Sequence, residues 1–283
     1  MANFDSANYV DIQKQDWNIA ASGWEKWDNW LDENMSELNS ILTGYAGVAQ
    51  GHKILDLGSG TGYPAIHAAR EVGAGGDVVG LDLADRMLEV ARKKSADEGV
   101  ENITFKTCDI RKIPFDNESF NAITSRFCFM FLPHLSDTLS EALRALKPGG
   151  KIAGAVWASV DDNPAFTLPV GVIKEYADVP QPDPQAPGLF ALAEPGKLKR
   201  AMENAGFSDV TEKEIGITWK YESGEIFVQS FKELAAPMKA LFNSLPADQR
   251  EEAESRIAQA AERYRADDGI EIPGMTLVVT GRK

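Results

Sequence analysis

The 283-residue chain contains only two cysteines and three histidines. Cys108 and Cys128 form neither a metal-binding spacing nor a disulfide framework, which indicates reduced, buried thiols. Basic residues are also few: 29 lysines and arginines stand against 43 acids, for a formal net charge of −14. Such a surface repels phosphate on average, which argues against nucleic acid and anionic membranes as partners.

Long apolar runs are missing as well. No stretch approaches the length of a membrane span, and residues 1–10 show no basic segment followed by a hydrophobic one. These absences predict a cytoplasmic protein without membrane contact. The remaining composition is that of an ordinary globular chain, long enough for one elaborated domain with a sizeable core.

One stretch organises the rest of the chain: Ile54-Leu-Asp-Leu-Gly-Ser-Gly-Thr-Gly-Tyr-Pro64. A strand-like segment runs directly into three glycines spaced by one residue, and Pro64 then opens an alanine-rich helical pattern. Glycine permits φ > 0 and the close approach of a ligand, and proline suits the first helical position. Backbone N–H groups and a helix N-terminus should therefore point at one volume, where an anionic or carboxylate-bearing ligand is expected.

The spacing of these glycines separates two ligand classes. A dinucleotide fingerprint requires glycine or alanine at the position of Tyr63. The loop instead reads Asp56-x-Gly58-x-Gly60-x-Gly62, which resembles the first motif of the class I S-adenosylmethionine (SAM) dependent methyltransferases. An oxidoreductase that uses a nicotinamide cofactor stays open as an alternative, and so does a non-catalytic SAM-binding regulator.

Strand and helix patterns alternate after the glycine loop, which predicts a parallel sheet with helices on both faces. Asp82 ends the second strand pattern, twenty residues beyond Gly62. An acid at this place can accept both hydroxyl groups of a ribose. Strands are expected at 53–57, 78–82, 103–109, 121–125, 151–157, 208–221 and 275–280.

A second motif, Arg144-Ala-Leu-Lys-Pro-Gly-Gly150, ends a helical pattern before the fifth strand. It is characteristic of small-molecule methyltransferases, especially those that resemble the ubiquinone and menaquinone biosynthesis group, and the resemblance is close over about residues 50–158. The resemblance implies an α/β fold: a doubly wound, Rossmann-like, seven-stranded sheet with the last strand antiparallel. It also implies SAM as the cofactor and a small molecule as the substrate.

Four parts of the chain are predicted. Residues 1–50 form an N-terminal helical cap, residues 51–158 the SAM-binding core, and residues 159–195 an acidic, proline-rich lid loop. Residues 196–283 complete the core and carry a helical insertion at about 224–268, which would cover the substrate.

The resemblance assigns the methionine end of SAM to the glycine loop and its ribose to Asp82. Leu83 and Met87 would flank the adenine, although core packing explains them equally well. Asp109 would accept the adenine amino group, with a turn cap as the alternative. The expected cofactor residues are Asp56, Gly58, Ser59, Gly60, Thr61, Gly62, Asp82, Leu83, Met87, Asp109, Ile110 and Arg126.

Aromatic residues mark the expected acceptor side. Trp24, Trp27, Phe131 and Trp157 would line a pocket for an apolar or aromatic acceptor, or for a cation held against rings. Docking of the N-terminal helix on the core is the competing interpretation of the tryptophans. Further candidates for the same pocket are Phe129, Phe190 and Trp219.

His134 is a weak candidate for a general base, because a histidine after a proline at a helix start is more often a cap. Arg126 stands where catechol-type methyltransferases carry a magnesium-binding aspartate, so no metal site is expected.

Overall fold

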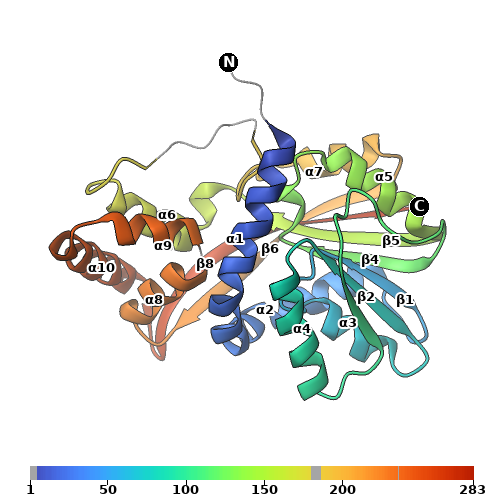
Figure 1. Ribbon diagram of the computed structural model, residues 1–283, viewed down its shortest axis with the longest axis horizontal. Helices are drawn as coiled ribbons and strands as arrows, with labels where there is room; N and C mark the ends of the chain where they lie inside the picture. Colours follow the sequence, from blue (N-terminus) through green and yellow to red (C-terminus); the bar gives the residue numbers. More distant parts are fainter. Residues whose placement is uncertain (1–4, 180–185, 235) are drawn as a thin grey trace.

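A single open sheet forms the centre of the computed structural model, which describes residues 5–179, 186–234 and 236–283 (Figure 1). The strand order is β3-β2-β1-β4-β5-β8-β6, and the short β7 pairs with β8. The strands are β1 Lys53–Leu57, β2 Asp77–Asp82, β3 Ile103–Thr107, β4 Phe120–Arg126, β5 Leu146–Trp157, β6 Ser208–Tyr221, β7 Arg265–Ala266 and β8 Gly269–Arg282.

Strands β1 to β5 run parallel, whereas β8 runs antiparallel to both β5 and β6. The apolar sequence of β1 suits a central strand, because such a strand is covered on both faces. Its residues Ile54, Leu55 and Leu57 are all fully buried. The doubly wound sheet with its last strand antiparallel confirms the predicted fold class.

Helices cover both faces of this sheet (Figure 1). On one face lie α2 Asp28–Ala46, α3 Ala65–Val72 and α4 Asp85–Asp97; on the other lie α5 Leu135–Ala145 and α7 Lys197–Asn204. None of the helices within the described ranges is long and apolar enough to cross a membrane.

The two longest strands, β6 and β8, project beyond the sheet into a helical lobe (Figure 1). Trp157 at the end of β5 pairs with Thr276 of β8, and β6 continues along β8 as far as Tyr221. The lobe contains α6 Pro164–Ile173, α8 Gly224–Leu234, α9 Ala236–Ser244 and α10 Ala247–Ala261. Short 3-10 helices are Phe129–Phe131, Val160–Asp162 and Glu262–Tyr264.

The N-terminal helix α1, Ser6–Lys26, crosses between the sheet and the lobe and packs against α4, α8 and α9 (Figure 1). Gly23 permits this packing, since a Cβ there would lie 2.1 Å from the carbonyl oxygen of Glu233 in α8. Two indole N–H groups form hydrogen bonds to the end of α8. Trp24 Nε1 donates to Leu234 O at 3.1 Å, and Nε1 of Trp27, the residue after α1, donates to Glu233 Oε2 at 2.6 Å. Helix α1 therefore joins the lobe to the core.

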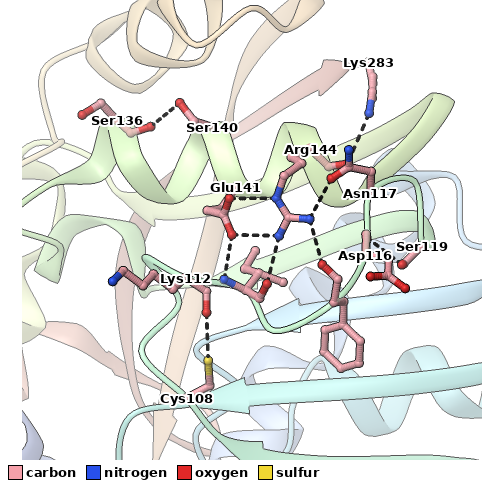
Figure 2. A network of polar contacts seen from close by, with 12 residues as sticks. Cys108, Lys112, Asp116, Asn117, Ser119, Ser136, Ser140, Glu141, Arg144 and Lys283 are labelled. Carbon is pink, nitrogen blue, oxygen red and sulfur yellow. Dashed lines mark hydrogen bonds and ion pairs between the residues drawn. The ribbon is translucent and has the colours of Figure 1, made fainter.

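Arg144, from the turn motif before β5, fixes the connection between β3 and β4 (Figure 2). Its guanidinium donates to the two carboxylate oxygens of Glu141, at 2.8 Å each. It also donates to the carbonyl oxygens of Ile113 and Phe115, at 2.9 and 2.8 Å, and to Asn117 Oδ1 at 3.1 Å. The motif's arginine is thus a structural clamp on a loop that lacks a helix.

The region predicted as a lid loop contains more regular structure than expected. Residues 164–173 form α6, whose buried face includes Leu168 and Ile173. Asn163 anchors its start, because the side chain of this residue exchanges hydrogen bonds with the main chain of Met275 at 3.0 and 3.1 Å. Residues 180–185, with three of the prolines on which the prediction relied, lie outside the described residues.

Candidate functional site

The glycine loop after β1 leaves space at one of its three glycines. All three have positive φ: +73° at Gly58, +51° at Gly60 and +113° at Gly62. A Cβ at Gly58 would meet Cys128 Sγ at 2.5 Å, and one at Gly62 would meet Ile66 Cδ1 at 2.7 Å. At Gly60 a Cβ would have no neighbour within 4 Å. The outer glycines are therefore needed for packing, and the middle one opens the loop to a ligand.

Asp82, at the end of β2, lies directly beside this opening. Its Oδ2 accepts from Gly60 N at 2.8 Å, and its Oδ1 accepts from Ala84 N at 2.8 Å. Burial raises the pKa of Asp82, while these backbone N–H groups oppose the shift. Each carboxylate oxygen keeps a second lone pair, so the group can accept two more hydrogen bonds from a ligand diol.

Three further N–H groups of the loop are used within the protein. Gly58 N and Ser59 N both donate to Leu81 O, at 2.8 and 2.9 Å, and Gly62 N donates to Ser59 O at 2.8 Å. We expected several N–H groups of the loop to point at the ligand. This expectation is wrong for these three residues, because their N–H groups donate to main-chain carbonyl oxygens of the protein.

Asp56 points into the protein instead of the crevice. It is fully buried, and its two oxygens accept from Ser59 Oγ at 2.6 Å and from Thr124 Oγ1 at 2.7 Å. Burial raises the pKa of Asp56 to about 6, although both hydroxyl donors act against the shift. Its carboxylate ties the glycine loop to β4 and reaches a ligand only through that loop.

The expected cofactor residues divide by exposure. Gly58, Gly60, Asp82, Leu83, Asp109 and Arg126 are partly exposed at the carboxyl ends of the strands. Asp56, Ser59, Thr61, Gly62, Met87 and Ile110 are buried. The first set is accessible to a ligand, whereas the second is covered by the protein itself.

The expected adenine end of the crevice is covered by α1. Met87 is buried against Ala20 and Ala21 of that helix, together with Ala84. Asp109 is bound by Arg111, whose Nε and Nη2 reach its Oδ2 at 3.0 and 2.5 Å. An adenine amino group would have to share this carboxylate with the guanidinium.

Arg126, at the end of β4, faces α2. Its Nη1 donates to Asn39 Oδ1 at 2.7 Å. Burial lowers the pKa of Arg126 to about 10, while the charges of Asp56, Asp32 and Asp28 oppose the shift, so the side chain stays cationic at neutral pH.

Tyr63 occupies the position that a dinucleotide fingerprint reserves for glycine or alanine. Its side chain is buried, and Lys94 Nζ lies 4.4 Å from the ring centroid. Lys94 is also ion-paired with Asp28 at the start of α2. The ring of Tyr63 therefore lies against α4, at the position where the fingerprint requires a small residue.

The aromatic residues expected at the acceptor side fall into two groups. Trp24 and Phe131 both pack edge-on against Trp17 of α1, with centroids 5.9 and 5.5 Å away. Phe129 is fully buried behind Gly154 and belongs to the core. Trp27 packs edge-on against Trp30, a member of the second group, with ring centroids 5.7 Å apart.

We call this second group the aromatic wall: Trp30, Phe127, Trp157, Phe166 and Trp219. Phe127 stacks on Trp157 with centroids 3.9 Å apart and planes 7° apart, and Trp30 stacks on Trp219 at 5.3 Å and 13°. Trp157 and Trp219 approach to 5.9 Å. Phe190 packs edge-on against Phe166 of the wall, with ring centroids 6.0 Å apart.

Sequence reasoning missed Trp30, Phe127 and Phe166 of this wall. Trp30 follows Trp27 by three residues, a helical spacing that was a usable signal. Phe127 directly follows β4 and has φ +57°, which no sequence pattern predicted.

His134 is exposed and is the N-cap residue of α5, where its side chain makes no cap hydrogen bond. In the part of the chain that the structure describes, no group of three or more histidine, cysteine or acidic side chains could hold a metal ion.

Comparison with known proteins identifies this architecture. Residues 54–150 match the family model described as a methyltransferase domain. The UbiE ubiquinone/menaquinone biosynthesis C-methyltransferase of Ectopseudomonas mendocina is 32% identical over 176 residues, 59% of this chain and 69% of that protein. The arsenite methyltransferase of Halobacterium salinarum is 36% identical over 109 residues, 38% of this chain and 28% of that protein. The chain spans less than half the length of the first curated relatives it matches.

The fold agrees with these sequence matches. The YcgJ protein of Bacillus subtilis superimposes with a TM-score of 0.56 at 18% identity, covering 87% of this chain and 97% of that one. Sheet order, glycine loop and strand-end acid together define a Rossmann-like methyltransferase. The chain belongs to the class I SAM-dependent methyltransferases, whose cofactor is SAM.

Proposed function

We propose that this protein transfers a methyl group from SAM to a small apolar or aromatic molecule. The observation that carries the proposal is the meeting of three features at one edge of the sheet. They are the open position at Gly60, the carboxylate of Asp82, and the aromatic wall above β4 and β5. Ligands of open α/β sheets bind at this edge.

The residues at the crevice fit SAM. The space at Gly60 admits an amino-acid chain against the loop, and the free lone pairs of Asp82 suit a ribose diol. Arg126 supplies a retained positive charge beside the loop. When bound, SAM supplies a methyl group already activated on a sulfonium. The protein then has to orient the two reactants and keep water out.

The acceptor side is apolar, because the wall consists of rings from α2, β5, α6 and β6 and from the residue after β4. Apolar pockets with few polar groups are typical of small-molecule sites. The formal charge of −14 agrees with an acceptor that is neither nucleic acid nor an anionic surface. UbiE and arsenite methyltransferases act on different acceptors by their names, so the acceptor itself is part of the proposal.

Two measurements test this function. Thermal unfolding with S-adenosylhomocysteine should show stabilisation by about 2.7 kcal/mol at a hundredfold excess over Kd, and NADH should give none. Incubation with methyl-tritiated SAM and an organic extract should place label in an extractable, apolar product. Stabilisation by NADH and not by S-adenosylhomocysteine would contradict methyl transfer. Stabilisation without any labelled product would favour a regulator that only binds SAM.

A further inference from the structure

Trp219 carries a buried donor without an acceptor. Its side chain is 7% exposed, and Nε1 has no hydrogen-bond partner among the described residues. Buried indole N–H groups usually find a partner. In this protein the N–H groups of Trp24, Trp27 and Trp30 donate to Leu234 O, Glu233 Oε2 and Lys220 O at 3.1, 2.6 and 2.5 Å. The exception at Trp219 therefore calls for an explanation.

The strand register places Trp219 above the carboxyl edge of the sheet. Thr276 of β8 pairs with Trp157 on one side and with Ile215 on the other. Trp219 lies four residues further along β6, opposite Ile272. At about 3.4 Å per residue, Trp219 lies roughly 14 Å beyond the end of β5. The residue thus overhangs the edge at which ligands of this fold class bind.

Three aromatic rings pack around the side chain of Trp219. Trp30 stacks on one side, Trp157 lies at 5.9 Å, and Phe166 lies at 6.5 Å with its plane at 85°. None of these neighbours offers a lone pair of the strength that an N–H group requires. A ligand oxygen brought into this apolar surrounding would be the missing acceptor, and burial would make that hydrogen bond strong.

A second, independent observation marks the same place. Phe127 has φ +57° and is the only apolar residue of the described chain, glycine aside, in the left-handed region. A bulky side chain in this region stores backbone strain, which persists mainly at ligand sites. Its ring stacks on Trp157, and so becomes part of the wall that Trp219 overhangs.

We propose that Trp219 determines acceptor specificity: its Nε1–H donates a hydrogen bond to an oxygen atom of the acceptor. The protein then selects apolar acceptors that carry a carbonyl or hydroxyl oxygen over hydrocarbons of the same shape. The inference rests on the proposed function, which puts the acceptor at this edge. The competing interpretation is a weak N–H to ring contact with Phe166.

The test uses two probes of equal shape, α-tetralone with a carbonyl oxygen and tetralin without one, each added to the protein saturated with S-adenosylhomocysteine. The indole cross-peaks of the 15N-labelled protein are followed by NMR, and that of Trp219 is identified by its loss in Trp219→Phe. With α-tetralone the Trp219 indole proton should shift downfield, and with tetralin it should stay. The wild-type protein should bind α-tetralone about tenfold more tightly than tetralin, and Trp219→Phe should abolish this ratio.

Trp24→Phe is the matched control, because it removes an N–H group that already has a backbone acceptor, at a residue outside the aromatic wall. This variant should keep the preference for α-tetralone. Equal binding of both probes by the wild type, no binding of either, or an unchanged ratio in Trp219→Phe would overturn the inference. If Trp219→Phe fails to fold, the wild-type protein still provides a test, because equal binding of the two probes rules the inference out. Stabilisation by S-adenosylhomocysteine does not depend on Trp219, so its absence would reject the proposed function separately.

Discussion

The main-chain N–H of Gly60 donates to Oδ2 of Asp82 at 2.8 Å, and this bond joins the ends of β1 and β2. It brings the one open position of the glycine loop next to the carboxylate that can accept a diol. An amino-acid group and a sugar bound at these two places would share one crevice. Variants at Gly60 and at Asp82 separate the contributions of the two ends of this bond.

Replacing Gly60 by alanine should weaken cofactor binding without unfolding the protein. The new Cβ meets no protein atom within 4 Å, so the cost in stability is the positive φ alone, about 1 kcal/mol. The methyl group would occupy the space left for the ligand, and we expect the affinity for S-adenosylhomocysteine in calorimetry to fall at least tenfold, by about 1.4 kcal/mol. Gly99→Ala is the control, since Gly99 has φ +67° and equally open surroundings. Equal binding by both variants would refute the assignment of Gly60.

Replacing Asp82 by asparagine should weaken cofactor binding by about 2 kcal/mol. The amide keeps one accepting oxygen, but its NH2 group must face either Gly60 N or Ala84 N, both of which are donors. Asp85→Asn is the matched control: Asp85 lies three residues further on, is exposed, and bonds Thr107 and Arg92 instead. If both variants lose the same affinity for S-adenosylhomocysteine in a titration, Asp82 does not bind the cofactor directly.

The parts of the site that sequence could predict are those set by local spacing. Residues 56–82 alone predict the glycine loop and the position of Asp82, because the first strand, its turn, one helix and the second strand follow one another within this segment. The strand alternation predicted the doubly wound sheet for the same reason. Even here the side-chain direction was not available: Asp56 turns inward because Thr124, a residue of a different strand, supplies its second donor.

Long-range partners explain what could not be predicted. Trp24 and Trp27 dock on Leu234 and Glu233, more than two hundred residues away, and no pattern near the tryptophans indicates that helix. The position of Trp219 likewise depends on how far β6 and β8 pair beyond β5. The sequence indicated only a strand at 275–280, whereas β8 spans Gly269–Arg282.

The buried carboxyl of Asp56 should make stability fall as pH rises. Its pKa is about 6 in the folded protein against 3.8 in the unfolded chain, so the folded state binds the extra proton between these values. Stability from this group is present below pH 3.8 and is lost as pH rises through about 6. Between pH 5 and 7.5 the loss should be about 1 kcal/mol.

Asp56→Asn isolates this contribution, because the amide does not titrate and can still bond both hydroxyls. Chemical unfolding of both proteins at pH 5 and 7.5 should show the variant gaining on the wild type by that amount at the higher pH. Parallel pH dependence of the two proteins would mean that Asp56 is ionised throughout.

Replacing Gly23 by alanine should separate α1 from the lobe. The added Cβ would lie 2.1 Å from Glu233 O, a backbone atom that cannot move away alone, so we expect a loss of about 1–3 kcal/mol in unfolding free energy. Gly44→Ala in α2 is the control, since a Cβ there meets nothing within 4 Å and alanine favours the helix by up to about 1 kcal/mol. Trypsin should cut Gly23→Ala faster after the exposed Lys14 and Lys26, because α1 opens more often. If Gly23→Ala resists trypsin and denaturant as well as Gly44→Ala does, helix α1 does not hold the lobe on the core.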